Sequence, residues 1–396
     1  PKLSACLSNP PARSIALRIR HAKICGRPRK WRRVLLLSSF FHRLLRHTIK
    51  NGHLADVRLF PEWAPQRALW TAWPASSKEW NGDLQSPRHD VAALVRALAP
   101  SNRIRVLVSS SEARQSAASA IGDVAELVSL AYGDIWLRDT SPLFATDLNG
   151  PCGLRFRNNG WGGKFLLPGD EAVGDGLAAL AGVPTRRFKF VLEGGAIDHD
   201  GAGTILATRQ TLLNKNRNGW SQAEAEEALH VALGARKLLW IDVGLASDHT
   251  DGHVDNVARF VGAGRIVIQE PVEPDDPNAG VFAAVAENLA GATDALGRQI
   301  DVVSIPSPGR FLNADGEVAP ASHLNFVIAN GIVAVPVFGT RSQADALKRL
   351  QAVFPDRKVV GLSASSLLGA GDAGGGAFHC ITREEPDYAR GRLFAK

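Results

Sequence analysis

The sequence predicts an α/β protein, and three observations support this fold class. Apolar runs rich in Val, Ile and Leu are typical of buried strands, and they occur at 104–110, 203–208, 265–269, 326–338 and 358–362. Helical stretches alternate with these runs. The 396 residues are 45% hydrophobic and 21% charged, a composition that is ordinary for a globular enzyme and unlike that of a disordered or fibrous chain.

The helical stretches lie at 86–100, 221–235 and 341–354. In the second of them, Ser221 can cap the first turn together with Glu224, and Gly234 is placed to end the helix. The turn-rich segment 270–280 is typical of a surface loop, and no long linker divides the chain after residue 56.

Charge is distributed unevenly along the chain. Residues 1–55 contain 13 Lys or Arg and no Asp or Glu, so the other 341 residues carry 7 − 13 = −6 of the net charge of +7. We expect residues 1–55 to be a basic extension outside the fold and residues 56–396 to form one catalytic domain. The acidic body favours a cationic ligand, and neither nucleic acid nor a membrane is expected as a partner.

The cysteines indicate a reducing compartment. They stand at positions 6, 25, 152 and 380 without a C-x-x-C pair, so we expect no disulfide framework, no structural zinc and a cytoplasmic protein. Export is the alternative, because 27–50 places basic residues before a short apolar run. That run has roughly half of the ~20 residues that a membrane span needs.

The segment HTDGHVDN contains alternating polar residues at His249, Asp251, His253 and Asp255. An extended backbone would place all four side chains on one face. Such a face could bind a metal ion or a cation, or it could be a solvated strand face.

The segment GGGAFHC joins glycines 374–376 to Cys380 through His379. Glycines let the backbone approach a ligand closely, so Cys380 is a candidate nucleophile. A free cysteine is more often a small buried hydrophobic residue, and both interpretations stay open on the residues alone.

Two further segments carry acidic residues. Glu193 follows the apolar run FKFVL and precedes two glycines, which places a carboxylate at the end of a strand. In DIWLRDTSP, an extended strand would point Asp134 and Asp139 to opposite faces, so that only one of them enters a given pocket. An ion pair of Asp134 with Arg138 on the surface is the alternative for the first carboxylate.

Together these segments resemble the agmatine deiminase family, which is similar to the bacterial peptidylarginine deiminases within the guanidine-modifying superfamily. The resemblance extends from Pro61 to Pro386. It rests on seven segments in order, PEWAPQRALWTAWP, DIWLRDTSPLF, NNGWGGKF, LEGGAIDHDGAGTILATRQTLLNKNRN, TDGHVDN, NFVIANG and GGGAFHCITREEP.

The resemblance implies a fivefold pseudo-symmetric α/β propeller of ββαβ units (pentein type) around an acidic pocket. It implies that Cys380 is the nucleophile and His253 the general acid and base. Glu193 then orients His253 and accepts guanidinium N–H groups, and the carboxylates of Asp139 and Asp255 grip the guanidinium nitrogens. Residues placed near the substrate are Asp134, Trp136, Trp161, Asn325 and Gly375.

The implied activity is hydrolysis of agmatine to N-carbamoylputrescine and ammonia in putrescine biosynthesis, without a metal or other cofactor. A homodimer is expected because dimers are common among soluble enzymes. After Trp73 and Pro74 the sequence reads ASSKEW, without the polar or acidic residue expected directly after the proline. Recognition of the distal end of the substrate, and thus the choice among agmatine, arginine and peptidyl-arginine, therefore stays open.

Three rival functions remain. The same cysteine chemistry could transfer the amidino group to an amine instead of to water. His249, Asp251, His253 and Asp255 could instead hold a metal ion for hydrolysis, and residues 1–55 could make the chain a binding module for nucleic acid or an anionic membrane.

Overall fold

The computed structural model describes residues 57–369 and 375–391. These residues belong to one compact unit of the chain, His53–Lys396. The expected basic extension 1–55, the apolar run within 27–50 and the cysteines at positions 6 and 25 lie outside the described residues.

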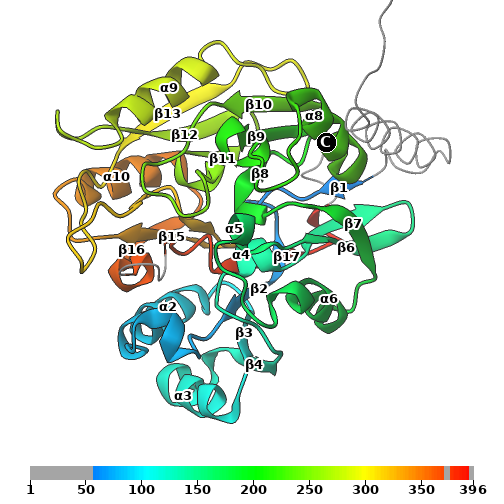
Figure 1. Ribbon diagram of the computed structural model, residues 1–396, viewed down its shortest axis with the longest axis vertical. Helices are drawn as coiled ribbons and strands as arrows, with labels where there is room; N and C mark the ends of the chain where they lie inside the picture. The colour runs from blue at the N-terminus through cyan, green and yellow to red at the C-terminus, as the bar shows by residue number, and fades with distance from the viewer. Residues whose placement is uncertain (1–56, 370–374, 392–396) are drawn as a thin grey trace, which may run out of the picture. The chain divides into compact units, whose positions relative to one another are not determined.

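The described residues form five small sheets (Figure 1). In four of them three consecutive strands pair so that the first is antiparallel to the second and the third is parallel to the second. The triplets are β5 (Leu143–Asp147), β6 (Gly150–Arg157) and β7 (Thr185–Val191); β8 (Ile197–His199), β9 (Thr204–Thr208) and β10 (Lys237–Ile241); β11 (Ala258–Gly262), β12 (Arg265–Glu270) and β13 (Asp301–Pro306); and β14 (Val327–Ile328), β15 (Ile332–Val337) and β16 (Lys358–Ser363).

The fifth sheet joins the two ends of the described chain. Strand β17 (Thr382–Pro386) pairs antiparallel with β2 (Gln66–Ala72), which is parallel to β3 (Ile104–Val108), and β4 (Glu126–Ser129) completes the order β17-β2-β3-β4. A short strand, β1 (Arg58–Leu59), pairs with the free edge of β5. The pairing of β17 with β2 places Cys380, which lies just before β17, beside the N-terminal part of the fold.

Helices connect the parallel strands, as the right-handed crossover of a βαβ unit requires. In Figure 1 the longer helices lie on the periphery of this unit; they are α2 (Gln85–Leu98), α3 (Ser111–Ile121), α6 (Asp170–Ala181), α8 (Gln222–Leu233), α9 (Ala279–Leu289) and α10 (Gln343–Val353). The short α4 (Leu137–Thr140) and α5 (Gly160–Gly163) lie toward its middle, and α7 (Arg209–Leu212) precedes α8. Within the part of the chain that the structure describes, no helix is long and apolar enough to cross a membrane.

Most elements expected from the sequence are present. Helix α8 begins with the expected capping box of Ser221 and Glu224, and Gly234 ends it in the left-handed conformation. The apolar run 326–338 forms two strands, β14 and β15, instead of one, because a turn at residues 330–331 separates them. Strand β16 covers 358–362 but is half-exposed, since it is an edge strand of its sheet.

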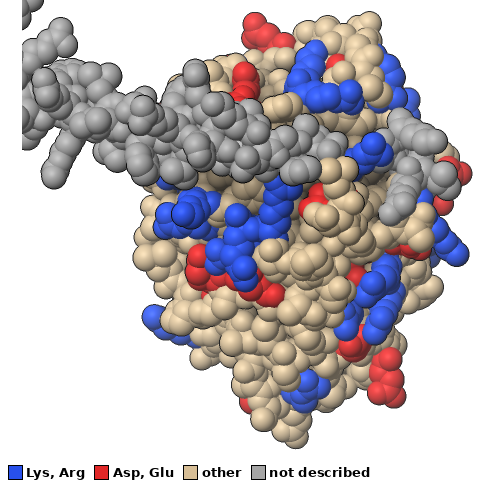
Figure 2. All heavy atoms as spheres, turned by 90° about the vertical axis from the view of Figure 1, so that its right-hand side faces the viewer, with Lys and Arg blue, Asp and Glu red and all other residues tan. Residues whose placement is uncertain are grey.

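The core lies between the sheets and their covering helices. All five residues of β3 are buried, and Trp70 and Trp73 are fully inaccessible to solvent. On the face drawn in Figure 2, Lys and Arg side chains lie beside Asp and Glu side chains. Surface ion pairs of this kind include Arg155 with Glu171 and Arg187 with Asp175.

Candidate active site

The segments between consecutive sheets supply the candidate residues. The connection from β4 to β5 carries Asp134, Trp136 and Asp139, and the one from β7 to β8 carries Glu193. His253 and Asp255 precede β11, Asn325 precedes β14 and Cys380 precedes β17. Each of the five sheets is therefore entered through a connection that carries a candidate residue, which explains how stretches far apart in the sequence contribute to one site.

The segment 249–256 is not an extended strand, so the expectation of four side chains on one face is wrong. Asp251 has φ +63° and Gly252 has φ +84°, which turns the chain, and Val254–Asn256 then form the 3₁₀ turn η4. Asp251 binds Lys164 at 2.6 Å and Arg217 at 2.7 Å. Because of this turn, Asp251 pairs with Lys164 and Arg217, whereas His253 and Asp255 are available to the site.

The segment DIWLRDTSP is not extended either. Residues 137–140 form the helical turn α4, so the five-residue spacing brings Asp134 and Asp139 into one pocket instead of onto opposite faces. Arg138 does not pair with Asp134, because its guanidinium binds Glu384 at 2.8 Å in the interior.

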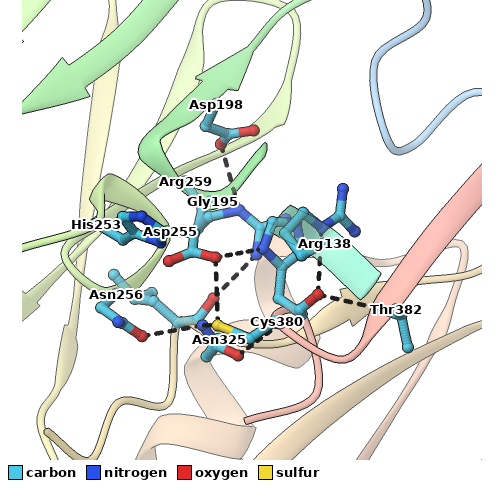
Figure 3. A network of polar contacts seen from close by, with 12 residues as sticks. Arg138, Gly195, Asp198, His253, Asp255, Asn256, Arg259, Asn325, Cys380 and Thr382 are labelled. Carbon is cyan, nitrogen blue, oxygen red and sulfur yellow. Dashed lines mark hydrogen bonds and ion pairs between the residues drawn. The ribbon is translucent and has the colours of Figure 1, made fainter. Parts of the chain in front are cut away.

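Cys380 is buried and bordered by polar groups from two other segments (Figure 3). The side-chain amide of Asn325 donates to its Sγ at 3.1 Å and also to Asn256 Oδ1 at 2.9 Å. The Sγ atom lies 3.7 Å from Asp255 Oδ2. Burial, followed by the Asp255 and Asp139 carboxylates, raises the pKa of the thiol well above 9.0, so the thiol is neutral.

His253 is fully buried among carboxylates. Its Nδ1 is 3.8 Å from Asp139 Oδ2, and neither ring nitrogen has a hydrogen-bond partner in the described part of the chain. Burial alone lowers the pKa of His253, but Asp139, Asp255 and Glu193 outweigh it and raise the pKa above 6.5. The imidazole is thus disposed to carry a proton.

Gly195 allows this close arrangement. A Cβ at this position would lie 2.6 Å from His253 Nδ1, 2.9 Å from Asp255 Oδ2 and 3.1 Å from Asp139 Oδ1. Its backbone N–H also donates to Asp139 Oδ1 at 2.8 Å. Only a glycine leaves room for the three side chains, and the sequence segment LEGGA gave no sign of which glycine this would be.

Glu193 is held by a residue that the sequence interpretation did not single out. The Nε of Arg217, whose side chain is almost fully buried, donates to Glu193 Oε1 at 2.6 Å, and its Nη1 donates to Asp251 Oδ2 at 2.7 Å. No hydrogen bond joins Glu193 to His253 in the described chain, so the carboxylate influences the imidazole through its charge. The only sequence signal for Arg217 was its position in the asparagine-rich segment LNKNRN.

A pocket leads to Cys380. Its empty volume is about 560 Å³, part of it open to solvent. The described lining residues are Glu79, Asp134, Trp136, Asp139, Trp161, Phe165, Leu167, His249, Thr250, Gly375, Gly376 and Cys380. Aromatic walls and three carboxylates, with no Lys or Arg among these residues, suit a flat or elongated cation.

The two tryptophans of the pocket are anchored to carboxylates. Trp161 donates from Nε1 to Asp139 Oδ2 at 2.8 Å. Trp136 stacks on Trp80, whose Nε1 donates to Asp134 Oδ1 at 3.1 Å. Burial raises the pKa of Asp134 to about 7, so this carboxyl group is easily neutralised.

The resemblance implied ten site residues, and the pocket contains six of them. Cys380, Asp139, Asp134, Trp136, Trp161 and Gly375 line it. His253, Asp255 and Asn325 lie directly behind this lining, through the contacts described above. Glu79, which also lines the pocket, was missed because it follows Pro74 by five residues instead of one.

The described residues contain no group of three or more His, Cys, Asp or Glu side chains arranged to hold a metal ion. His249 lines the pocket, whereas Asp251 turns toward Arg217. The four residues of the proposed metal site therefore do not converge on one point.

The chain is similar to known deiminases over most of its length. Residues 58–386 match the model of the Porphyromonas-type peptidyl-arginine deiminase family. The agmatine deiminase of Ectopseudomonas mendocina is 33% identical over 82% of this chain and 94% of its own length. That of Pseudomonas fluorescens is 32% identical over 86% and 98%.

Among solved structures, the agmatine deiminase of Enterococcus faecalis superposes with a TM-score of 0.78 at 28% identity, covering 84% of this chain and 96% of its own. The fold is therefore the mixed α/β fold of these enzymes. On the length and extent of these matches, the chain belongs to the Porphyromonas-type peptidyl-arginine deiminase family.

Proposed function

We propose that this protein is an agmatine deiminase, which hydrolyses agmatine to N-carbamoylputrescine and ammonia and so serves putrescine synthesis. The observation that carries the proposal is the placement of the Cys380 thiol at a cation-binding pocket, 3.7 Å from Asp255 and beside Asn325. The similarity to the agmatine deiminases of Ectopseudomonas and Pseudomonas supports the same reaction.

Asp139 and Asp255 are proposed to bind the guanidinium nitrogens. Charged hydrogen bonds from a planar guanidinium to two carboxylates fix its central carbon in one place. One oxygen of Asp255, Oδ1, is buried and has no partner in the described chain, so it can accept an N–H group of the substrate. Glu193 and His253 lie on the same carboxylate-rich side of the site.

The reaction then takes two steps. The Cys380 thiolate adds to the guanidinium carbon, and the C–N bond to ammonia breaks as His253 gives its proton to the leaving nitrogen. His253, now neutral, takes a proton from water, whose oxygen adds to the same carbon. The C–S bond breaks as the new hydroxyl group releases its proton to water, and the thiolate returns with release of the carbamoyl amine.

The protonation states of the empty site fit this sequence when the charge of the substrate is included. A neutral thiol cannot attack, but a bound guanidinium offsets the Asp139 and Asp255 charges that help to raise the thiol pKa. His253 already carries the proton that the leaving group needs, because the same carboxylates raise its pKa. Substrate binding therefore lets the thiol release its proton to water, which forms the nucleophile.

Agmatine is preferred over arginine because of two further acidic residues in the pocket. Glu79 and Asp134 lie on its lining, where a distal ammonium group would gain a favourable charge contact and an α-carboxylate would be repelled. Glu79 thus takes the place of the acidic residue that is missing directly after Pro74. Free arginine and peptidyl-arginine remain the alternative substrates.

The wider architecture is part of the proposal. Each of the five sheets contains a ββαβ unit, and the unit made by β17, β2, α2 and β3 closes the series through the chain ends. These units support a fivefold pseudo-symmetric propeller with the site on its axis. We further propose that residues 56–396 act as one catalytic domain, that the enzyme is a cytoplasmic homodimer and that residues 1–55 are dispensable for activity.

A product assay tests the proposed function. Wild type and Cys380→Ala are given agmatine, arginine and an arginine-containing peptide, and the ureido product is measured. We expect turnover of agmatine by the wild type and none by the variant. Absence of a ureido product with all three substrates would reject the deiminase proposal.

Two additions separate the rival reactions. In ¹⁸O-labelled water, hydrolysis places one labelled oxygen in the ureido product, whereas amidino transfer to an amine does not. Activity that disappears in a strong chelator and returns with a divalent metal would favour the metal-dependent alternative over the cysteine mechanism.

A further inference from the structure

A buried histidine beside the nucleophile has no part in the reaction as described so far. His379 is 2% exposed, and it directly precedes Cys380. Its Nδ1 lies 2.7 Å from Asp255 Oδ2, and its Nε2 lies 3.2 Å from Glu62 Oε2. Burial and the short Nδ1 contact hold the ring in place relative to Asp255.

This contact decides which oxygen of Asp255 is free. Asp255 is fully buried, and its Oδ2 faces both His379 and the Cys380 thiol. The other oxygen, Oδ1, has no hydrogen-bond partner in the part of the chain that the structure describes. A buried carboxylate oxygen without a partner is costly, so it is the natural acceptor for a ligand N–H group.

A rigid frame lies behind His379. Glu62 accepts a backbone N–H at 2.7 Å through Oε1 and binds the fully buried Arg259 through Oε2. Arg259 also donates to the backbone carbonyl groups on either side of Asn325, at 3.1 and 3.0 Å. The backbone N–H of His379 in turn donates to the carbonyl of Asn325 at 3.0 Å. The frame thus connects the two residues that contact the Cys380 sulfur.

We propose that His379 is a positioning residue, whose Nδ1–H holds Asp255 Oδ2 and thereby directs Oδ1 at the guanidinium group of the substrate. The inference rests on the proposed deiminase function. Burial, with Arg138 and Arg259 nearby, lowers the pKa of His379 well below 6.5, so the ring is neutral and carries a single N–H. A neutral imidazole has only one donor. We place it on Nδ1, because the Nδ1 contact with Asp255 is the shorter one, 2.7 Å against 3.2 Å from Nε2 to Glu62, and the Glu62 oxygen already binds Arg259.

Two substitutions separate this role from simple burial. In His379→Asn, the amide nitrogen can take the branch position of Nδ1 and still donate to Asp255. In His379→Gln, the amide extends to the position of Nε2 and faces Glu62. Both variants remove the ring and leave a polar side chain. A difference in their kinetic constants therefore reports on the hydrogen bond to Asp255.

We expect kcat/KM for agmatine to fall less than about fivefold in His379→Asn and about 30- to 100-fold in His379→Gln, as the loss of a hydrogen bond to a charged group implies. In His379→Gln both a higher KM and a lower kcat are expected, because Asp255 acts in binding and in positioning for attack. The pH profile of His379→Asn should keep its midpoints, since His379 itself transfers no proton.

The binding step is measured separately. In a Cys380→Ser background, which cannot turn over, calorimetry should give a weaker agmatine affinity for His379→Gln than for His379→Asn by a similar factor. Equal kinetic constants in the two variants, or losses that only follow the fraction of folded protein, would overturn the positioning role. A wild type without any ureido product would instead reject the proposed function itself.

His323 supplies the matched control. It is another fully buried histidine, and its Nδ1 faces a backbone carbonyl, that of Pro336, at 2.8 Å. His323→Asn and His323→Gln should lower the unfolding temperature without changing kcat/KM by more than about twofold. If kcat/KM differs between these two variants as it does between the two His379 variants, the difference is a general property of buried histidines and the proposal is wrong.

Discussion

The side-chain amide of Asn325 donates to the Sγ atom of Cys380 at 3.1 Å, and Asp255 Oδ2 lies 3.7 Å from the same sulfur. The same amide carbonyl accepts the backbone N–H groups of Ala377 and Cys380 at 3.1 and 3.2 Å. A single residue therefore holds both the backbone and the sulfur of the nucleophile, and it supplies a hydrogen-bond donor that stabilises a thiolate.

Replacement of Asn325 by alanine tests this relationship. We expect kcat to fall about 10- to 100-fold, because a hydrogen bond to a charged group contributes about 1.5–3 kcal/mol. Steady-state kinetics with agmatine provide the measurement. Asn288→Ala, in a surface pair with Asp242, is the control and should keep wild-type activity. Equal activity of Asn325→Ala and wild type would contradict the assigned contact.

Gly195→Ala should abolish turnover while leaving the fold intact. The added Cβ would lie within 3.1 Å of His253, Asp255 and Asp139, so at least one of these side chains must move. A loss of more than about 100-fold in kcat is expected, since displacements of about 1 Å at a reacting centre have effects of this size. The matched control is Gly262→Ala in β11, where a Cβ meets nothing within 4 Å. Thermal unfolding of both variants shows whether the fold persists.

The thiol of Cys380 should react slowly with iodoacetamide in the empty enzyme. Its pKa lies well above 9.0 because of burial and of the Asp255 and Asp139 charges, so the reactive thiolate is rare at pH 8. Asp139→Asn removes one of these charges and should speed alkylation of Cys380 while it abolishes turnover. Peptide mass spectrometry follows the label.

Cys152 is the internal control for this experiment. Burial raises the pKa of its thiol to about 11, and it lies in another part of the core. Its alkylation should not respond to Asp139→Asn. Complete labelling of Cys380 in the wild type at pH 8, at the rate of a free thiol, would show that the empty site holds a thiolate.

Asp134 should make the stability of the protein depend on pH. Its pKa is about 7 in the fold against 3.8 as the ordinary value, so the folded protein retains a proton that the unfolded chain releases. The stabilisation linked to this group is complete below the ordinary pKa and is lost as the pH rises to about 7.

Asp134→Asn removes that dependence. Between pH 4 and pH 8, the free energy of unfolding of the variant should rise relative to wild type by about 2–4 kcal/mol, since each pKa unit corresponds to about 1.4 kcal/mol. Urea unfolding at both pH values gives the difference, and effects of the substitution that do not depend on pH cancel. If the free energy of unfolding changed equally with pH in the two proteins, Asp134 would be ionised in the fold. KM for agmatine should rise in the variant if this carboxylate meets the distal ammonium group.

The sequence by itself predicted the α/β fold class and singled out most of the candidate site residues. Apolar runs and the capping pattern at Ser221 and Glu224 located β3, β9, β12 and α8, because periodicity and capping are local properties. The resemblance to the agmatine deiminase family, carried by short sequence motifs, pointed to the thiol, the imidazole and the acids as candidates.

Only the tertiary structure decided how these groups face one another. The segment with His253 and Asp255 turns where an extended strand was expected, and α4 brings Asp134 and Asp139 to one pocket, since contacts with distant segments override local backbone preference. Arg217, Gly195 and His379 gain their importance from neighbours far away in the chain. A linear sequence carries no distance between such positions, so their role becomes visible only once five connections between sheets converge on one thiol.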